Sequence, residues 1–386
     1  MFKILTMNKI AACGTDRLPA DSFSVSGAEA SPHAILVRSA DMHGFEAPES
    51  LLAVGRAGAG TNNIPVDKYA EKGIVVFNTP GANANAVKEL VIAGLLLSSR
   101  KIVEGVNWAN GLAGQTGVPK LVEAGKSQFA GPEIAGKKIG VIGLGAIGVL
   151  VANACNSLGM EVYGFDPFVS VDAAWKLSRS IIKASSLETV IAESDYITVH
   201  VPLNASTKTL FGSETVAKIK PGARLLNFSR GELFANADIK NALETGILAA
   251  YTTDFPNDEL LGVKGVIPIP HLGASTPESE DNCAVMAADE ISQYLTYGDI
   301  KNSVNFPDCE IPYTGRKRFC VLHRNIPNVV GPLTTAVAEK GINIDNMLNR
   351  SKGAYAYTVI DVDSTDVDGI AEKLLKVDGA LRVRVI

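Results

Sequence analysis

Short apolar segments alternate with longer polar stretches along most of the chain. Near the N-terminus, mostly apolar segments occur at 2–7, 33–40, 51–58 and 73–80. Strands that are buried on both faces are continuously apolar, so these segments predict a parallel sheet covered by helices. The almost wholly apolar segment 86–100 predicts a helix that is buried all round, between domains or between subunits.

The same alternation continues through the middle of the chain. The expected strands there lie at 137–143, 161–166, 196–201, 223–231, 247–254 and 266–273. Helices are expected at 146–158, after a capping box at 185–188, and from Asn236 onward. This strand–helix–strand order predicts a doubly wound sheet, whose ligands bind at the carboxyl ends of its strands. A long helix at 276–297 is expected to carry the chain back to the first domain.

The composition changes near 305–318, where two prolines, a glycine and a basic cluster predict a linker. Beyond it, the expected elements follow the order βαββαβ of a ferredoxin-like module. The predicted fold class is therefore α/β. It comprises two doubly wound parallel-sheet domains, Rossmann-like or flavodoxin-like, and one small ferredoxin-like domain.

Composition narrows the class of protein. The 386 residues, 46% of them hydrophobic, suit two or three domains of about 150 residues each. The longest apolar run, 90–97, is far shorter than the roughly 20 residues that span a bilayer, and we see no signal peptide. The net charge of −5 argues against nucleic acid as a partner. Five cysteines without a CxxC pair, and no cluster with ligand spacing, predict free thiols, a cytoplasmic location and no metal.

A glycine-rich turn, GLGAIG at 143–148, follows one expected strand and opens the next helix. Gly143 would make the turn, Gly145 would let the backbone approach a pyrophosphate, and Gly148 would let the helix pack on the sheet. Asp166 ends the next strand and can accept both hydrogen bonds of an adenosine ribose diol. No arginine follows it closely, so NAD is favoured over NADP. The alternative is a glycine-rich turn that binds no ligand.

Three polar residues fall where neighbouring strands should end: Arg230, Asp254 and His271. This set suits hydride transfer at an alcohol next to a carboxylate. His271 would exchange the hydroxyl proton as general acid or base, and Arg230 would bind the substrate carboxylate with its planar fork. Alternatively, each residue alone is a structural hydrogen-bonding group. His200 also ends a strand, and we expect a structural role for it.

Several motifs resemble one family. The fingerprint, NFSRG at 227–231 and HLGAST at 271–276 are similar to the D-isomer-specific 2-hydroxyacid dehydrogenases. The motifs GRAG at 55–58 and NTPG at 78–81 resemble the phosphoglycerate dehydrogenase branch of that family. The resemblance implies oxidation of 3-phospho-D-glycerate to 3-phosphohydroxypyruvate, the first step of L-serine biosynthesis. Other D-2-hydroxyacid dehydrogenases, acting on glycerate or 2-hydroxyglutarate, and a non-catalytic NAD(H)-sensing protein remain alternatives.

The resemblance also assigns roles to individual residues. It makes Arg230, Glu259 and His271 the catalytic set, with Glu259 paired to the imidazole; a second alignment would make Asp258 that partner. It implies that Asp254 binds the carboxamide group of the nicotinamide. Further cofactor contacts are implied at the helix-opening and strand-end positions Ala146, Ile147, Phe228, Ser229, Gly273 and Ala274.

The phosphate end of the substrate is expected to meet Arg38 and Arg56, each of which is alternatively a salt-bridge residue at a domain edge. Backbone N–H groups at Gly81 and Ala82 would assist at the carboxylate. We therefore expect a discontinuous substrate-binding domain at 1–94 and 276–305, an NAD-binding domain at 95–275, a linker at 306–316 and a regulatory domain at 317–386.

Residues 317–386 resemble an ACT domain through the motifs HRNIP at 323–327 and GINI at 341–344. Such domains pair with a second copy, and the resemblance implies an L-serine site at the joint formed by His323, Asn325 and Asn343. Asn328 replaces a usual glycine and tolerates positive φ. A purely oligomerising domain without a ligand is the alternative. The expected assembly is a homo-oligomer, a dimer or a tetramer.

Overall fold

The computed structural model describes all 386 residues, which divide into two compact units. Unit 1 consists of Met1–Asn83 together with Pro277–Ile386, and unit 2 is the intervening Ala84–Thr276. No helix in either unit combines the length and the apolar character needed to cross a membrane.

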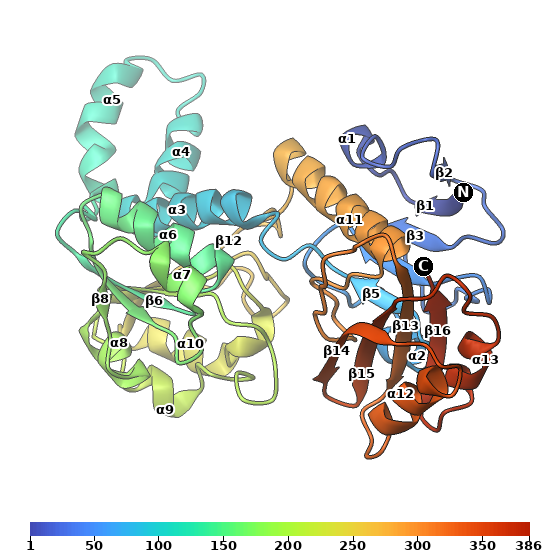
Figure 1. The fold of residues 1–386 in the computed structure, drawn as a ribbon. Coiled ribbons are helices and arrows are strands. Elements are labelled where there is room, and N and C mark those ends of the chain that lie inside the picture. The colour runs from blue at the N-terminus through green and yellow to red at the C-terminus, as the bar shows by residue number, and fades with distance from the viewer. The chain divides into compact units, whose positions relative to one another are not determined.

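The N-terminal part of unit 1 is a five-stranded parallel sheet with the order β2-β1-β3-β4-β5 (Figure 1). The strands are β1 (Phe2–Met7), β2 (Phe23–Ser26), β3 (Ala34–Val37), β4 (Ala53–Arg56) and β5 (Val75–Phe77). The helices packed on this sheet or beside it are α1 (Ala12–Thr15), α2 (Val66–Glu71) and α11 (Pro277–Tyr297). This flavodoxin-like order confirms the predicted doubly wound sheet. Strand β2 was not predicted, because only Phe23 of its four residues is buried and the segment is not continuously apolar.

Unit 2 is built on a seven-stranded parallel sheet with the order β12-β11-β10-β9-β6-β7-β8. Its strands are β6 (Lys138–Ile142), β7 (Glu161–Phe165), β8 (Ile182–Lys183), β9 (Tyr196–Val199), β10 (Ala223–Asn227), β11 (Leu248–Thr253) and β12 (Val266–Pro268). Its helices are α3 (Ala84–Arg100), α4 (Ile102–Asn110), α5 (Val118–Gly125), α6 (Ala146–Ser157), α7 (Val171–Trp175), α8 (Leu187–Glu193), α9 (Ser213–Val216) and α10 (Asn236–Glu244), with short 3₁₀ turns at Lys126–Phe129 and Gly231–Leu233. The order is Rossmann-like and reverses between β6 and β9.

Both faces of the unit 2 sheet are covered, as continuous apolar strands require. Because successive side chains point to opposite faces, Leu226 packs in a core with α3 and α6, whereas Leu225 packs in a second core with α8, α9 and α10. Helix α8 begins at Ser186, whose hydroxyl accepts a hydrogen bond from the Thr189 N–H at 3.2 Å. The cap therefore lies one residue after the predicted start of the capping box.

Within one copy of the chain, helix α3 is buried along one face, and its burial between domains or subunits stays a prediction. Its side chains at Val87, Val91 and Leu95 are buried, but Leu96 is 38% exposed. Helices α4 and α5, which were not predicted, extend away from the rest of unit 2 in Figure 1. Neither helix has a buried residue. Large apolar side chains are instead exposed on them, at Ile102, Val103, Val106 and Leu121.

The C-terminal part of unit 1 is an antiparallel sheet with the order β14-β15-β13-β16. Its elements are β13 (Lys317–Arg324), α12 (Val330–Ala338), β14 (Ile344–Lys352), β15 (Tyr355–Val362), α13 (Ile370–Leu375) and β16 (Ala380–Val385). This is the predicted βαββαβ order of a ferredoxin-like module. Asn328, in the turn before α12, has a φ of +62°, which an asparagine tolerates.

Both faces of this C-terminal sheet are covered. Phe319 and Val321 face α12 and α13, whereas Cys320 and Leu322 enter a core that also contains Tyr294 of α11. The predicted linker at 306–316 is packed along its first half, where side chains are buried at Phe306, Cys309 and Ile311. The C-terminal sheet and the N-terminal sheet therefore share one continuous apolar core within unit 1.

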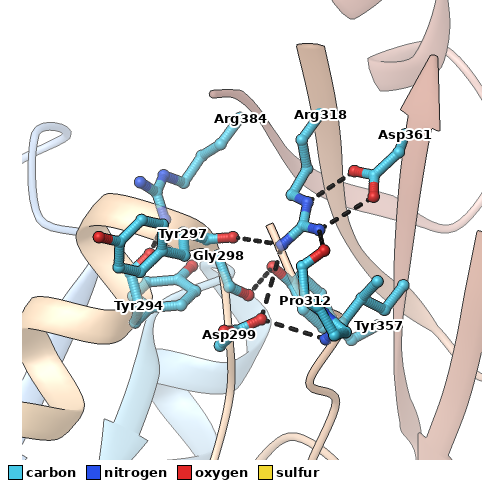
Figure 2. Close-up of polar contacts among 10 residues, drawn as sticks. Tyr294, Tyr297, Gly298, Asp299, Pro312, Arg318, Tyr357, Asp361 and Arg384 are labelled. Atoms are coloured by element: carbon cyan, nitrogen blue, oxygen red, sulfur yellow. Dashed lines mark hydrogen bonds and ion pairs between the residues drawn. The ribbon is translucent and has the colours of Figure 1, made fainter. Parts of the chain in front are cut away.

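Polar contacts reinforce this joint (Figure 2). The fully buried Arg318 donates to both carboxylate oxygens of Asp361, at 2.6 and 2.9 Å, and to the Tyr297 carbonyl at 2.8 Å. Arg384 donates to the carbonyl oxygens of Tyr294 and Leu295 at 2.9 and 2.8 Å. These carbonyls lie at the C-terminal end of α11, where a cation is favoured by the helix dipole.

Loss of one partner of the buried pair should destabilise unit 1 strongly. In Asp361→Ala, the Arg318 guanidinium would stay buried without its bidentate partner, a loss that costs about 3–5 kcal/mol. The matched control is Asp345→Ala, whose partner Arg316 is half exposed, so the expected cost is about 1 kcal/mol or less. Urea unfolding of both variants measures the difference, and equal small losses would contradict the assigned role of the pair.

Candidate active site

The glycine-rich turn between β6 and α6 has two glycines that the fold itself requires. Gly143 has a φ of +88°, and a Cβ there would lie 2.6 Å from the His200 carbonyl oxygen. A Cβ at Gly148 would lie 1.8 Å from the Gly143 oxygen. A Cβ at Gly145, in contrast, would meet no protein atom within 4 Å. Open space over the Gly145 backbone fits the predicted approach of a pyrophosphate, which a side chain would block.

Asp166, directly after β7, holds this turn. Its two carboxylate oxygens accept hydrogen bonds from the backbone N–H groups of Leu144 and Phe168, each at 2.8 Å. Each oxygen keeps a second lone pair, so the carboxylate can still accept hydrogen bonds from a ribose diol. Asp166 therefore fits the ribose role and also stabilises the turn, a second role that the sequence did not reveal.

A cavity of about 380 Å³ adjoins the turn and is lined by Gly143, Gly145, Asp166 and the loop that follows β9. The loop residues that line it are His200, Val201, Pro202, Asn204, Ser206 and Thr207. Except for His200, for which we expect a structural role, none of these residues was predicted from the sequence. A signal was available, because β9 lies next to β6 where the strand order reverses, and ligands bind at the carboxyl ends of strands there.

His200 lies at the inner wall of this cavity. Its Nε2 lies 3.0 Å from the Thr198 hydroxyl, and burial lowers its pKa to about 3. The ring is therefore neutral at physiological pH and is suited to hydrogen bonding rather than to proton transfer.

Three strand ends bring the predicted chemistry together in unit 2. Arg230, Asp254 and His271 follow β10, β11 and β12, which are adjacent parallel strands. Burial raises the pKa of Asp254 to about 7, although the nearby charge of Arg230 lowers it. Burial and then Arg230 lower the pKa of His271. The Arg230 guanidinium is thus electrostatically coupled to both residues, and it favours the neutral, proton-accepting imidazole.

Asp254 has a buried oxygen, Oδ1, without a hydrogen-bond partner. A buried acceptor of this kind is costly unless a donor satisfies it. The carboxamide N–H₂ of a nicotinamide would supply that donor. Together with the open space over Gly145, this orphaned oxygen shows that the residues present fit NAD.

The imidazole of His271 packs on the Phe255 ring, with centroids 4.7 Å apart. Asp258 and Glu259 are both exposed, and no hydrogen bond joins either carboxylate to His271. The Glu259 backbone N–H instead donates to the Asn257 side chain at 3.1 Å. Which carboxylate supports the imidazole stays a prediction.

The remaining predicted cofactor residues surround the same strand ends. Phe228 is buried beneath Gly94, where a Cβ would lie 2.6 Å from the phenyl ring, so only the Phe228 backbone can face a ligand. The Ser229 hydroxyl donates to the Val201 carbonyl at 2.6 Å and links β10 to the loop after β9. Four further positions remain. Ala146 and Ile147 open α6, and Gly273 and Ala274 follow His271.

The predicted phosphate residues lie in unit 1. Arg38 directly follows β3 and Arg56 ends β4, and these strands are neighbours. Arg38 donates to Glu280 of α11 at 2.6 Å, and the Arg56 guanidinium folds over Gly58. The turn at 81–82 follows β5, the next strand of the sheet, so the structure gathers all four predicted positions at one edge of it.

The predicted serine residues are not gathered in one copy of the chain. His323 is buried, and its ring nitrogens already have partners in the Arg324 carbonyl and the Thr358 hydroxyl, at 2.8 and 2.9 Å. Asn325 follows the end of β13 that pairs with Tyr355, whereas Asn343 lies near the opposite end of the sheet. Seven residue steps at about 3.3 Å each separate these ends by about 23 Å.

Comparisons with known proteins identify relatives of this chain. Residues 93–273 match the model of the D-isomer specific 2-hydroxyacid dehydrogenase NAD binding domain. The chain is 33% identical to D-3-phosphoglycerate dehydrogenase of Escherichia coli K12 over 357 residues, which covers 89% of this chain and 83% of that protein. It is also 33% identical to the D-3-phosphoglycerate dehydrogenase of Haemophilus influenzae over 354 residues, with the same coverage.

A solved structure shares the fold. NAD⁺-bound 3-phosphoglycerate dehydrogenase of Entamoeba histolytica superposes with a TM-score of 0.62 at 24% identity, covering 78% of this chain and 98% of that one.

A doubly wound sheet with this turn and these strand-end groups defines a dinucleotide-dependent dehydrogenase. The chain belongs to the D-isomer-specific 2-hydroxyacid dehydrogenase family, and it is an NAD-dependent enzyme that acts on a small-molecule substrate.

Alanine substitutions at two glycines of the turn should separate binding from folding. Gly145→Ala places its methyl group in open space, so thermal stability should persist while NADH affinity falls at least about tenfold, or 1.4 kcal/mol. Gly148→Ala collides with the Gly143 carbonyl and should lower the thermal midpoint clearly. Fluorescence titration with NADH and thermal unfolding report the two effects. Wild-type affinity in a folded Gly145→Ala variant would refute the placement of the pyrophosphate.

Proposed function

We propose that this enzyme oxidises 3-phospho-D-glycerate to 3-phosphohydroxypyruvate, the first step of L-serine biosynthesis. The similarity to D-3-phosphoglycerate dehydrogenases over most of both chains carries the proposal. A cytoplasmic location belongs to it as well, and the five cysteines are free thiols, as is usual in a reducing compartment.

The residues of unit 2 would divide the chemistry among them. NAD, when bound, supplies the acceptor for the hydride that leaves C2 of the substrate. His271 takes the proton of the C2 hydroxyl, and its lowered pKa keeps the ring neutral and ready for that proton. The Arg230 guanidinium holds the substrate carboxylate and polarises the reacting oxygen. A carboxylate, either Glu259 or Asp258, stabilises the imidazolium that forms.

Recognition of the phosphate is assigned to unit 1. Arg38 and Arg56 end neighbouring strands, so two guanidinium groups start from one sheet edge. Arginine suits a phosphate because its planar fork donates two hydrogen bonds. The backbone N–H groups of the turn at 81–82 would meet the carboxylate end.

Turnover by purified protein tests the assignment. With NAD and 3-phospho-D-glycerate, the wild type should form NADH, and it should do so faster than with D-glycerate or D-2-hydroxyglutarate. His271→Ala should lower kcat about 10²- to 10⁴-fold because it removes the general base, with NADH affinity nearly kept. Full activity in that variant would refute the role of His271. A preference for an unphosphorylated acid would show that this acid, rather than 3-phospho-D-glycerate, is the substrate. No turnover with any of these acids would indicate a non-catalytic NAD(H)-sensing protein.

Serine regulation is a further part of the proposal, and it requires two copies of the chain. Asn325 and Asn343 present amides at opposite ends of the sheet, so one effector can touch both only across a joint between modules. A dimer or tetramer is proposed, and the apolar side chains exposed on α4 and α5 support it. His323 would then act through its contact with Thr358 rather than as a direct ligand.

Calorimetric titration with L-serine checks this site. The wild type should bind serine, and Asn343→Ala and Asn325→Ala should each weaken binding at least about tenfold because each removes one side of the joint. Asn346→Ala, an exposed asparagine on β14, serves as the control and should leave binding unchanged. Wild-type serine affinity in Asn343→Ala would show that serine binds at another site.

A further inference from the structure

A cavity of about 640 Å³ lies within unit 1, and apart from the turn at 81–82 none of its lining residues has a role in the proposed chemistry. One wall is a lateral face of α11 that presents Asn282, Val285, Met286 and Gln293. The opposite wall comes from the segment 299–310, which a bridge between Ile300 and Cys309 holds in place. The cavity therefore has an ordered frame with apolar and polar groups on the same helix face.

Glu290 of α11 lines this cavity and is only 7% exposed. Its Oε1 accepts a hydrogen bond from the Asn302 side chain at 2.7 Å, whereas its Oε2 is buried and has no partner. Asn302 has a φ of +59°, so this amide is presented from a left-handed backbone conformation. When this carboxyl is ionised, its orphaned oxygen calls for a donor that the protein does not supply.

Each of the other carboxylates of the cavity already has a cationic partner. Asp289 pairs with Arg17 at 2.8 Å, and Glu310 pairs with Lys301 at 3.8 Å. Asp299 faces Arg318 at 3.6 Å (Figure 2). A divalent cation prefers several free carboxylate oxygens, so the single remaining carboxyl is a poor match for a metal. One buried carboxyl beside apolar side chains matches a monovalent organic cation instead.

We propose that this cavity binds a small primary ammonium compound with a short aliphatic chain. The ammonium group donates a hydrogen bond to Oε2 of Glu290. The chain lies against Val285 and Met286, and the amides of Asn282 and Gln293 offer further polar contacts. The turn at 81–82 also borders the cavity, but the test of binding does not depend on catalysis.

The charge state of Glu290 predicts two measurable effects of ligand binding, a release of protons and an affinity that depends on pH. Burial raises its pKa to about 8, the Asn302 hydrogen bond and Lys301 lower it, and Asp308 and Asp289 raise it. At pH 7 the carboxyl is therefore mostly protonated, whereas an ammonium ligand requires the carboxylate. Each ligand that binds at pH 7 should release almost one proton. As the pH rises, affinity should increase nearly tenfold per unit below about pH 7 and about fivefold between about pH 7 and pH 8.

Calorimetry with n-butylammonium chloride, in two buffers of different ionisation enthalpy, measures both quantities on the intact chain. The wild type should bind at millimolar concentration and release a proton at pH 7. Glu290→Gln, which can keep the Asn302 hydrogen bond, should abolish proton release and weaken binding at least about tenfold. The control is Glu310→Gln, whose carboxylate also lines the cavity but does not contribute to the shifted pKa of Glu290, and it should bind within about twofold of the wild type.

A second variant and a neutral probe keep the test decisive. Met286→Trp should place a larger side chain one helical turn from Glu290 and hinder binding without removing the carboxyl. Thermal unfolding verifies that each variant is folded. Neutral n-butanol should bind far more weakly than n-butylammonium. The proposal is overturned by no binding of n-butylammonium at tens of millimolar, by equal binding of n-butanol, or by wild-type affinity in folded Glu290→Gln or Met286→Trp.

Discussion

The parallel pairing of β10, β11 and β12 is the constraint on which the candidate chemistry depends. The register places Asn227 beside Thr253 and Thr253 beside Pro268, so the chain leaves all three strands at one edge. Residues that follow those strands must then lie close together, however far apart they are in sequence. The coupling of Arg230 to both Asp254 and His271 follows from this register, whereas burial raises the pKa of the Asp254 carboxyl against that coupling.

The C-terminal module raises a different physical question, because its sheet is part of the core of unit 1. Cys320 and Leu322 share a core with Tyr294 of α11, and Arg384 binds the carbonyls at the end of the same helix. An effector bound by the module could influence the enzyme only through differential affinity for two arrangements. Within unit 1, α11 is the element through which such a preference would pass, since it contacts both sheets.

Much of the fold was predictable because buried strands leave continuous apolar runs, and because the glycine fingerprint lay between a strand and a helix. The predicted strand 223–231 was too long, since Phe228 is buried beyond the end of β10 without pairing in the sheet. Helices α4 and α5 were not predicted, although their apolar residues recur at helical spacing, and neither helix buries a residue within the chain. The sequence also could not show that Asn325 and Asn343 lie at opposite ends of one sheet, because that separation arises from strand pairing.

In the proposed reaction, a carboxylate-binding arginine and a proton-accepting histidine serve direct hydride transfer from C2 of the substrate. The most direct measurement uses 3-phospho-D-glycerate deuterated at C2 with unlabelled NAD, followed by mass spectrometry of the reduced cofactor. The account predicts one deuterium in each NADH formed and none released to water. Unlabelled NADH, with the deuterium lost to solvent, would contradict it.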